Sequence, residues 1–168
     1  MRRKNEGFSL IEFVIVMAIM AILTGLVALG MGVFDQAKVK DVSESINSAF
    51  SELKTENMSK TGPIYMHMFI FEGNYYVEMG PVSTCSMTGD YGTNIGEVTD
   101  SKIALDGNEM QDGDVWTFNI SKKDGSFNSI SSTPLDTASP TISVSTPDDS
   151  LTYDVVLVRD TGRHYIDK

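Results

Sequence analysis

An uncharged apolar stretch from Phe13 to Phe34 constrains the fold of this chain more than any other feature. A single carboxylate, that of Glu12, precedes it directly, and a short basic head occupies residues 1–7. About 20 apolar residues are enough for a helix to cross the hydrocarbon core of a bilayer. A charged side chain at the bilayer centre costs on the order of 3 kcal/mol, so Glu12 needs a partner or a place at the interface. The stretch predicts a membrane-length helix with one functional acid.

Two ordinary kinds of segment share part of this pattern. A secretory signal peptide also begins with basic residues, but its apolar region spans roughly 7 to 15 residues and ends in small residues at a cleavage site. The run from Phe13 to Phe34 is longer, and no small-x-small site closes it. An uncleaved single-pass anchor fits the length, but it gives Glu12 no role beyond a position at the membrane interface.

The residues around Gly7 follow a more specific pattern. Gly7-Phe8-Ser9-Leu10-Ile11-Glu12 resembles the cleavage and methylation signal of the type IV pilin and pseudopilin family. The resemblance implies that a prepilin peptidase cuts between Gly7 and Phe8 and that the new terminal amine of Phe8 is methylated. It also implies that Glu12 takes part in subunit assembly. The likeness is close over the basic head and the apolar stretch, and only architectural beyond them.

Electrostatics explains why a glutamate at this offset is useful. Cleavage after Gly7 would expose an α-amino group that is protonated near neutral pH. A positive charge would then lie at the N-terminal end of an apolar helix. Glu12 lies about one helical turn along, where its carboxylate can pair with that amine or with the amine of a neighbouring subunit. The resemblance implies the intermolecular pair, which would help to set the register between adjacent helices.

The helix is expected to continue beyond the apolar stretch. From Phe34 to Ser59, apolar residues recur at steps of three and four: Val39, Val42, Ile46, Ala49 and Leu53, with Phe50 beside them. No proline interrupts residues 8–62, and Gly62-Pro63 ends the pattern. The spacing predicts an amphipathic helix whose apolar stripe packs on the protein's own core. A continuous helix from Ser9 to Ser59 would be on the order of 75 Å long.

The pattern of strand-forming and turn-forming residues in 63–168 predicts one antiparallel β domain of modest size. Three hairpins are predicted: Ile64 to Phe71 with Tyr75 to Met79, Val115 to Ile120 with Phe127 to Ile130, and Leu151 to Arg159 with Arg163 to Ile166. Their expected turns are Gly73-Asn74, Lys123 to Ser126 and Asp160 to Gly162. Segments 80–96 and 131–150 are expected to be loops that carry short strands such as Thr141 to Ser145.

The predicted fold class is therefore α+β, with a long N-terminal helix, half in the membrane and half amphipathic, packed on a C-terminal antiparallel β-sheet domain. The expected boundaries are a leader at 1–7, a transmembrane and assembly helix at 8–34, an amphipathic helix at 35–62 and the globular domain at 63–168.

The distribution of charged residues predicts the orientation in the membrane and disfavours nucleic acid as a partner. Basic residues crowd the N-terminal side of the apolar stretch, so the positive-inside rule places the N-terminus in the cytoplasm and the remainder outside. The leader holds three of the 13 basic and one of the 23 acidic residues, so its removal would change the net charge from −10 to about −12. An acidic exported domain stays soluble and disfavours nucleic-acid binding.

Residues that carry chemistry are sparse. Cys85 is the only cysteine, so an intrachain disulfide cannot form. His67 and His164 lie on separate predicted strands, and no metal-binding, nucleophile-elbow or phosphate-loop spacing is present. Calcium could bind the oxygen-rich segments 106–109 and 112–114, although turn-forming Asp-Gly pairs explain these residues without an ion. No enzymatic activity, cofactor or metal site is predicted.

Four functions can be ranked by how well they fit these features. The first is a structural subunit of a type IV pilus, held in the cytoplasmic membrane before assembly and outside the cell afterwards. The alternatives are a pseudopilin of a type II secretion or DNA-uptake system, and a membrane-anchored extracellular binding domain that never polymerises. A secreted hydrolase comes last, because no nucleophile, base or metal constellation is evident. The partners that the resemblance implies are other pilin subunits, the prepilin peptidase, the assembly platform protein and the assembly ATPase.

Overall fold

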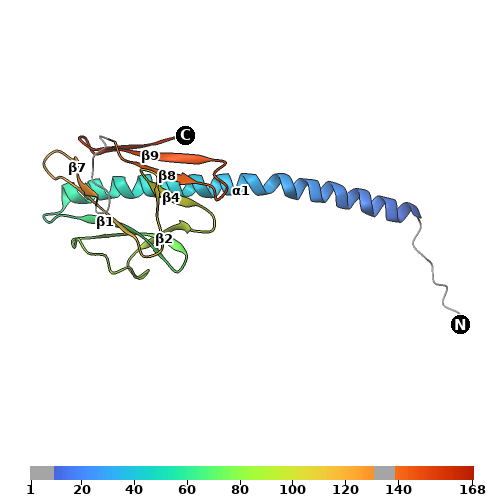
Figure 1. The fold of residues 1–168 in the computed structure, drawn as a ribbon, viewed down its shortest axis with the longest axis horizontal. Helices are drawn as coiled ribbons and strands as arrows, with labels where there is room; N and C mark the ends of the chain where they lie inside the picture. The colour runs from blue at the N-terminus through green and yellow to red at the C-terminus, as the bar shows by residue number, and fades with distance from the viewer. Residues whose placement is uncertain (1–9, 131–138) are drawn as a thin grey trace. The chain divides into compact units, whose positions relative to one another are not determined.

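The computed structural model describes residues 10–130 and 139–168, with side chains except those of residues 26–33, 129 and 130. Within this part of the chain one long helix, α1 (Leu10–Ser59), is followed by ten β-strands (Figure 1). The chain divides into two compact units, Met1–Phe34 and Asp35–Lys168. The first part of α1 belongs to the first unit, and the second part of α1 belongs with all the strands to the second unit.

Local sequence explains where α1 ends. Gly62-Pro63 follows the last helical turn, and proline cannot continue a helix because it lacks the N–H donor and clashes with the preceding turn. The buried side chain of Asn57 then holds the departing chain: its Nδ2 donates to Ile64 O and its Oδ1 accepts from Ile64 N, both at 2.9 Å. The helix predicted from Ser9 to Ser59 is thus observed from Leu10 to Ser59.

The first sheet has five antiparallel strands in the order β3-β2-β1-β6-β7. Its members are β1 (Tyr65–Phe71), β2 (Asn74–Gly80), β3 (Thr93–Glu97), β6 (Val115–Ile120) and β7 (Phe127–Ile130). The turn between β1 and β2 consists of Glu72 and Gly73, whose φ angles of 49° and 76° give the left-handed geometry that matches strand twist. The turn predicted at Gly73-Asn74 is wrong by one residue, because Asn74 already pairs with Phe71.

The second sheet also has five antiparallel strands, in the order β10-β9-β8-β4-β5. Its members are β4 (Lys102–Leu105), β5 (Asn108–Glu109), β8 (Thr141–Ser145), β9 (Thr152–Val158) and β10 (Arg163–Asp167). The predicted antiparallel β-sheet domain therefore contains two sheets. The predicted hairpins are present, but they are shared between two sheets, and the second sheet is completed by β4 and β5, which no local pattern marks.

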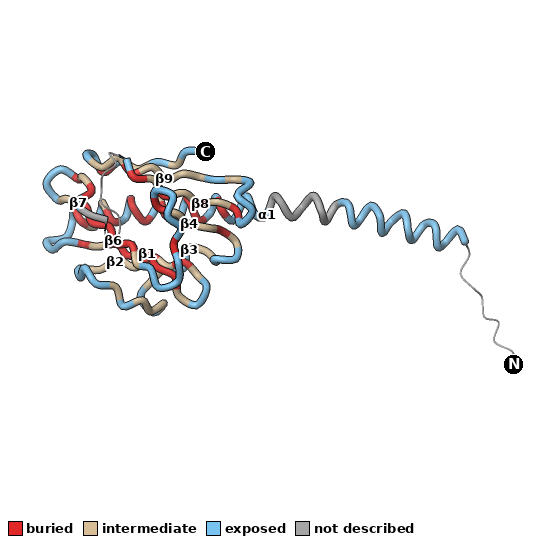
Figure 2. Tube along the Cα trace, viewed as in Figure 1, coloured by how far each residue is buried: buried red, intermediate tan, exposed pale blue. Residues whose placement is uncertain are grey.

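One hydrophobic core joins the second part of α1 to both sheets. The predicted stripe of α1 is buried throughout: Val39, Val42, Ile46, Ala49, Phe50 and Leu53. The Phe50 ring makes an edge contact with Phe118 of the first sheet at a centroid distance of 5.1 Å, and it lies 5.9 Å from the ring of His164 in the second sheet. Figure 2 shows the buried positions gathered along this part of α1 and the strands around it. The α+β class, with the helix packed on antiparallel sheet, is confirmed.

Candidate functional site

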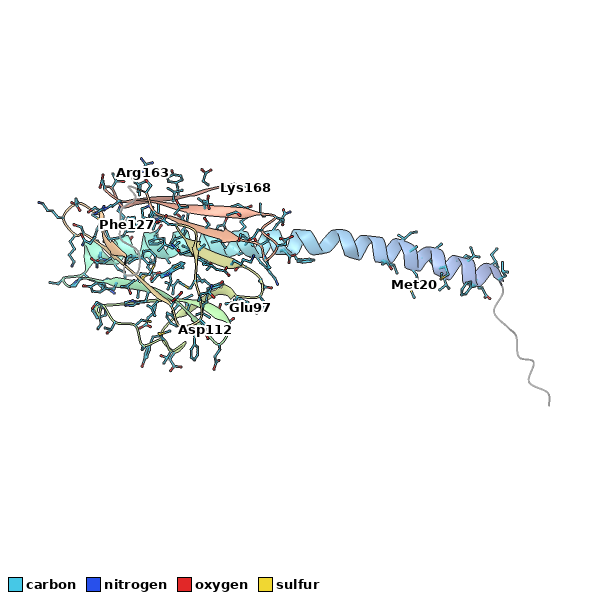
Figure 3. The ribbon with its side chains drawn as sticks, viewed as in Figure 1. Met20, Glu97, Asp112, Phe127, Arg163 and Lys168 are labelled. Carbon is cyan, nitrogen blue, oxygen red and sulfur yellow. The ribbon has the colours of Figure 1, made fainter. Side chains whose placement is uncertain are left out.

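The first part of α1 presents large apolar side chains to its surroundings. Those between Leu10 and Leu23 are exposed over 51% to 83% of their surface, and Figure 3 shows Met20 among them. Glu12 lies in the first turn of α1. A helix that is apolar around its circumference is ordinarily covered by lipid or by other helices. This segment is the part of the described chain whose side chains most need a partner outside it.

The predicted cleavage and methylation positions precede the first described residue, Leu10. Gly7 and Phe8 lie outside the described residues, so their roles in cleavage and methylation stay predictions, as does the assembly role of Glu12. In the part of the chain that the structure describes, no helix combines the length and the apolar character that crossing a membrane requires.

The second unit carries a groove between α1 and the β2–β3 side of the first sheet. Its volume is about 690 Å³, and four carboxylate residues of α1 line it: Asp41, Glu44, Glu52 and Glu56. Tyr91, Thr93 and Asn94 line the opposite wall. The lining contains neither histidine nor cysteine, and its four carboxylates make this wall of the groove acidic.

One histidine lies at hydrogen-bond distance from a serine. His164 Nε2 on β10 lies 2.9 Å from Ser51 Oγ on α1, and His164 Nδ1 lies 3.4 Å from the carbonyl oxygen of Gly162. The serine hydroxyl also lies 3.2 Å from Asn47 O, as expected for a helical serine that bonds back to the preceding turn. Burial lowers the pKa of His164, so the neutral ring is favoured there. The pair joins α1 to the second sheet. Because the two residues are 113 positions apart, no sequence motif predicts their contact.

The other histidine and the single cysteine are held in structural contacts. His67 is buried, with Nδ1 at 2.9 Å from Thr117 Oγ1 and Nε2 at 3.0 Å from Val82 O, so it ties the loop after β2 to the first sheet. Cys85 is half-buried and its thiol donates to Glu78 Oε2 at 3.5 Å. Burial raises the pKa of this thiol, which reduces its reactive thiolate fraction.

The acidic segments considered for calcium serve the backbone of turns. Asp106 and Gly107 have φ angles of 48° and 83° in the turn between β4 and β5, and Asp106 Oδ1 accepts from Thr141 N at 2.8 Å. Asp114 Oδ2 accepts from Gln111 N at 2.9 Å. Within residues 10–130 and 139–168, no three His, Cys, Asp or Glu side chains lie close enough together to hold a metal ion. The turn interpretation of these residues agrees with the geometry.

Comparison with protein families matches the N-terminal part of the chain. Residues 2–28 match the model of the prokaryotic N-terminal methylation motif. No curated protein and no solved structure matches the chain at significant similarity. The matched residues include Gly7, Phe8 and Glu12 and run into the apolar part of α1. The chain therefore carries the type IV pilin-type signal for prepilin cleavage and methylation. This signal indicates a pilin-like or pseudopilin-like precursor.

Proposed function

We propose that this chain is a structural subunit of a type IV pilus that is cleaved between Gly7 and Phe8 and then polymerises. One juxtaposition carries the proposal. The methylation motif at residues 2–28 includes the start of a helix that exposes apolar side chains from Leu10 to Leu23. A leader that is removed and an apolar stem that needs covering are together what a filament subunit requires, because removal frees the stem to pack with other stems.

Before assembly, residues 8–34 would hold the precursor in the cytoplasmic membrane with the basic leader on the cytoplasmic side. The length of the apolar stretch and the basic residues before it support this placement. The prepilin peptidase would remove residues 1–7 and methylate the amine of Phe8. The amphipathic helix at 35–62 and the globular domain at 63–168 would then lie outside the membrane.

During assembly, the stems would leave the lipid and pack together. Glu12 would neutralise the Phe8 amine of a neighbouring subunit, since an unpaired charge among apolar helices is costly. The pair would also set the register of one stem against the next. Assembly would require a platform protein and a cytoplasmic ATPase, so this subunit itself needs no nucleotide and no catalytic site.

A pseudopilin of a secretion or DNA-uptake system shares the same signal and the same stem. The observation that would favour it is confinement of the processed protein to the cell envelope, without surface filaments. A membrane-anchored binding domain that never polymerises would leave the apolar residues from Leu10 to Leu23 in lipid and would gain nothing from Glu12. The two alternatives thus differ from the pilus subunit in where the mature chain is found and in whether Glu12 matters.

The test is a Glu12→Ala variant expressed in cells that assemble filaments of the wild-type chain. Loss of the carboxylate leaves the Phe8 amine uncompensated, so we expect filament yield to fall by about tenfold or more while leader removal and membrane insertion continue. Glu52→Ala is the matched control, because Glu52 is an exposed glutamate on the second part of the same helix. Equal filament yield from Glu12→Ala and Glu52→Ala would contradict the proposed assembly role.

A further inference from the structure

The unit formed by Asp35–Lys168 carries its charges unevenly. We define its Ser59 end as the last turns of α1 with the turns β6–β7 and β9–β10. The basic residues there are Lys54, Lys60, Lys122, Lys123, Arg159 and Arg163. The acidic residues at this end are Glu56, Asp124 and Asp160. In a chain with a net charge of −10, the described residues of this end are therefore basic on balance.

The fold gathers this basic end from three separate segments. The ammonium of Lys54 donates to the carbonyl oxygens of Thr161 and Gly162 at 3.2 Å and 3.3 Å, so the β9–β10 turn lies against α1. The ammonium of Lys122 donates to Lys60 O, which brings the β6–β7 turn to the end of the helix. These cations also face the C-terminal end of α1, where the helix dipole favours positive charge.

The opposite end, which we call the Asp35 end, is acidic. It consists of the start of this part of α1 with the turns β1–β2, β3–β4 and β8–β9. Its exposed or half-buried acids are Asp35, Glu72, Glu97, Asp100, Asp148 and Asp149. Its lysines are already paired: Lys38 with Asp100 at 2.7 Å, Lys40 with Glu44 at 3.6 Å and Lys102 with Asp149 at 2.9 Å. In Figure 3 Glu97 lies away from Arg163 and Phe127, which mark the Ser59 end.

Each end keeps charge that the chain itself does not neutralise. At the Ser59 end, the side chains of Lys123 and Arg163 are exposed and make no hydrogen bond or ion pair with any described residue. At the Asp35 end, hydrogen bonds from Thr146 and Ser150 lower the pKa of Asp148 to about 2, so this carboxylate stays charged across the physiological range. The surplus charges are thus of opposite sign at the two ends.

We propose that the Ser59 end of one copy of this chain binds the Asp35 end of a second copy, head to tail. Such a contact uses two different surfaces, so each copy keeps one free surface and the contact can repeat along a filament. Complementary charge would select this orientation and speed the encounter, since like ends repel. The inference rests on the proposed function for its biological setting, but the contact itself can be measured without a filament.

A second copy fits the basic end better than a nucleic acid does. The exposed surface elsewhere is acidic, and a net charge of −10 repels a polyanion approaching from any other side. The acidic complement required is already present on every other copy in the same membrane. A nucleic acid is therefore kept as an outcome of the test and not as the proposal.

The test compares four charge-reversed variants of the full processed chain in non-ionic detergent: a reversal of each end, the two reversals combined, and a control. Lys123→Glu with Arg163→Glu reverses the Ser59 end, and Glu72→Lys with Glu97→Lys reverses the Asp35 end. The matched control, Glu44→Lys with Glu52→Lys, makes the same change of charge as the Asp35-end reversal at exposed positions of α1 between the two ends. Sedimentation velocity measures self-association at about 50 mM and about 500 mM sodium chloride, where screening lengths differ severalfold.

We expect each end reversal to weaken self-association at low salt by about tenfold, and the four combined substitutions to restore it. High salt should remove most of the difference, and the control should associate as the wild type does. Unchanged association of both end reversals, or loss without restoration in the combined variant, would overturn the inference. So would a result in which Lys123→Glu with Arg163→Glu abolishes only the binding of a DNA duplex. Salt-sensitive head-to-tail association in a chain that forms no filaments would instead contradict the proposed function alone.

Discussion

The two parts of α1 belong to one continuous helix and differ in what covers them. Between Leu10 and Leu23 the apolar side chains are exposed, whereas Val39, Ile46, Phe50 and Leu53 are completely covered by the two sheets. The second part carries polar residues between its apolar ones and packs within its own chain. The first part has no such alternation, so intrachain packing cannot satisfy it. The contrast shows that helix formation and helix burial are separate problems. From Leu10 to Leu23 the chain forms the helix but does not itself bury the large apolar side chains.

The largest expected difference between the two parts of α1 is between two phenylalanine variants. Phe50→Ala removes a fully buried ring that touches Phe118 and Phe127, so we expect the free energy of unfolding to fall by about 3 to 5 kcal/mol. Phe13→Ala removes a ring that is 63% exposed and should leave that free energy unchanged. Urea denaturation of both variants in detergent measures the difference, and equal losses would refute the division of α1.

A second comparison uses two glycines. Gly162 has a φ of +59°, and a Cβ there would overlap the backbone carbonyl of Gly125, so Gly162→Ala should cost about 2 to 4 kcal/mol. Gly25 lies on the first part of α1. Apart from its chain neighbours and the nearby helix backbone, an added Cβ there would meet no atom within 4 Å. Gly25→Ala should therefore be neutral or slightly stabilising. Thermal unfolding of the two variants tests this, and a stable Gly162→Ala would show that the two turns can separate at little cost.

Removing a hydroxyl from each part of α1 should give a smaller difference in stability. Ser43 Oγ donates to Val39 O at 2.8 Å in the buried stripe, and Thr24 Oγ1 donates to Met20 O at 2.7 Å on the exposed part. Ser43→Ala should cost about 1 kcal/mol, because it removes a hydrogen bond in a buried site. Thr24→Ala should cost nothing, since alanine is the better helix former. Chemical denaturation separates the two, and an equal cost would argue that Ser43 gains nothing from burial.

The smallest expected effect is a pH dependence that belongs to the second part alone. Burial lowers the pKa of His164 from 6.5, so the folded state binds fewer protons than the unfolded state below about pH 6.5. The contribution of neutral His164 is complete above that pH and is lost as the pH falls through the lowered pKa. His164→Gln should flatten the slope of stability as the pH falls below about 6.5. An unchanged slope in this variant would assign the pH dependence to other groups.

The part of the fold that follows local rules could be predicted from sequence. The bounds of α1 and its buried stripe follow from spacing, and the hairpins follow from glycine turns such as Gly73 and Gly125, whose positive φ angles other residues rarely adopt. The second sheet could not be predicted, because β4 pairs with β8 across a long separation, with Lys102 opposite Ser145. β3 is polar and largely exposed, and it pairs with β2 where Gly96 lies close to Val42 of α1.

The candidate site divides in the same way. Gly7, Phe8 and Glu12 stand at fixed offsets ahead of an apolar helix, so spacing alone is enough to recognise their pattern, and the motif match at residues 2–28 agrees with it. The Ser51–His164 contact and the two charged ends depend on how distant segments pack, and no local pattern encodes such a meeting.

Intact-mass analysis with N-terminal sequencing of the membrane-extracted protein tests the central claim most directly. In cells with an active prepilin peptidase, the proposed function predicts a mature chain that begins at Phe8 and carries a methylated amine. A mature chain that still begins with Met1 and retains Arg2 and Arg3 in those cells would contradict it.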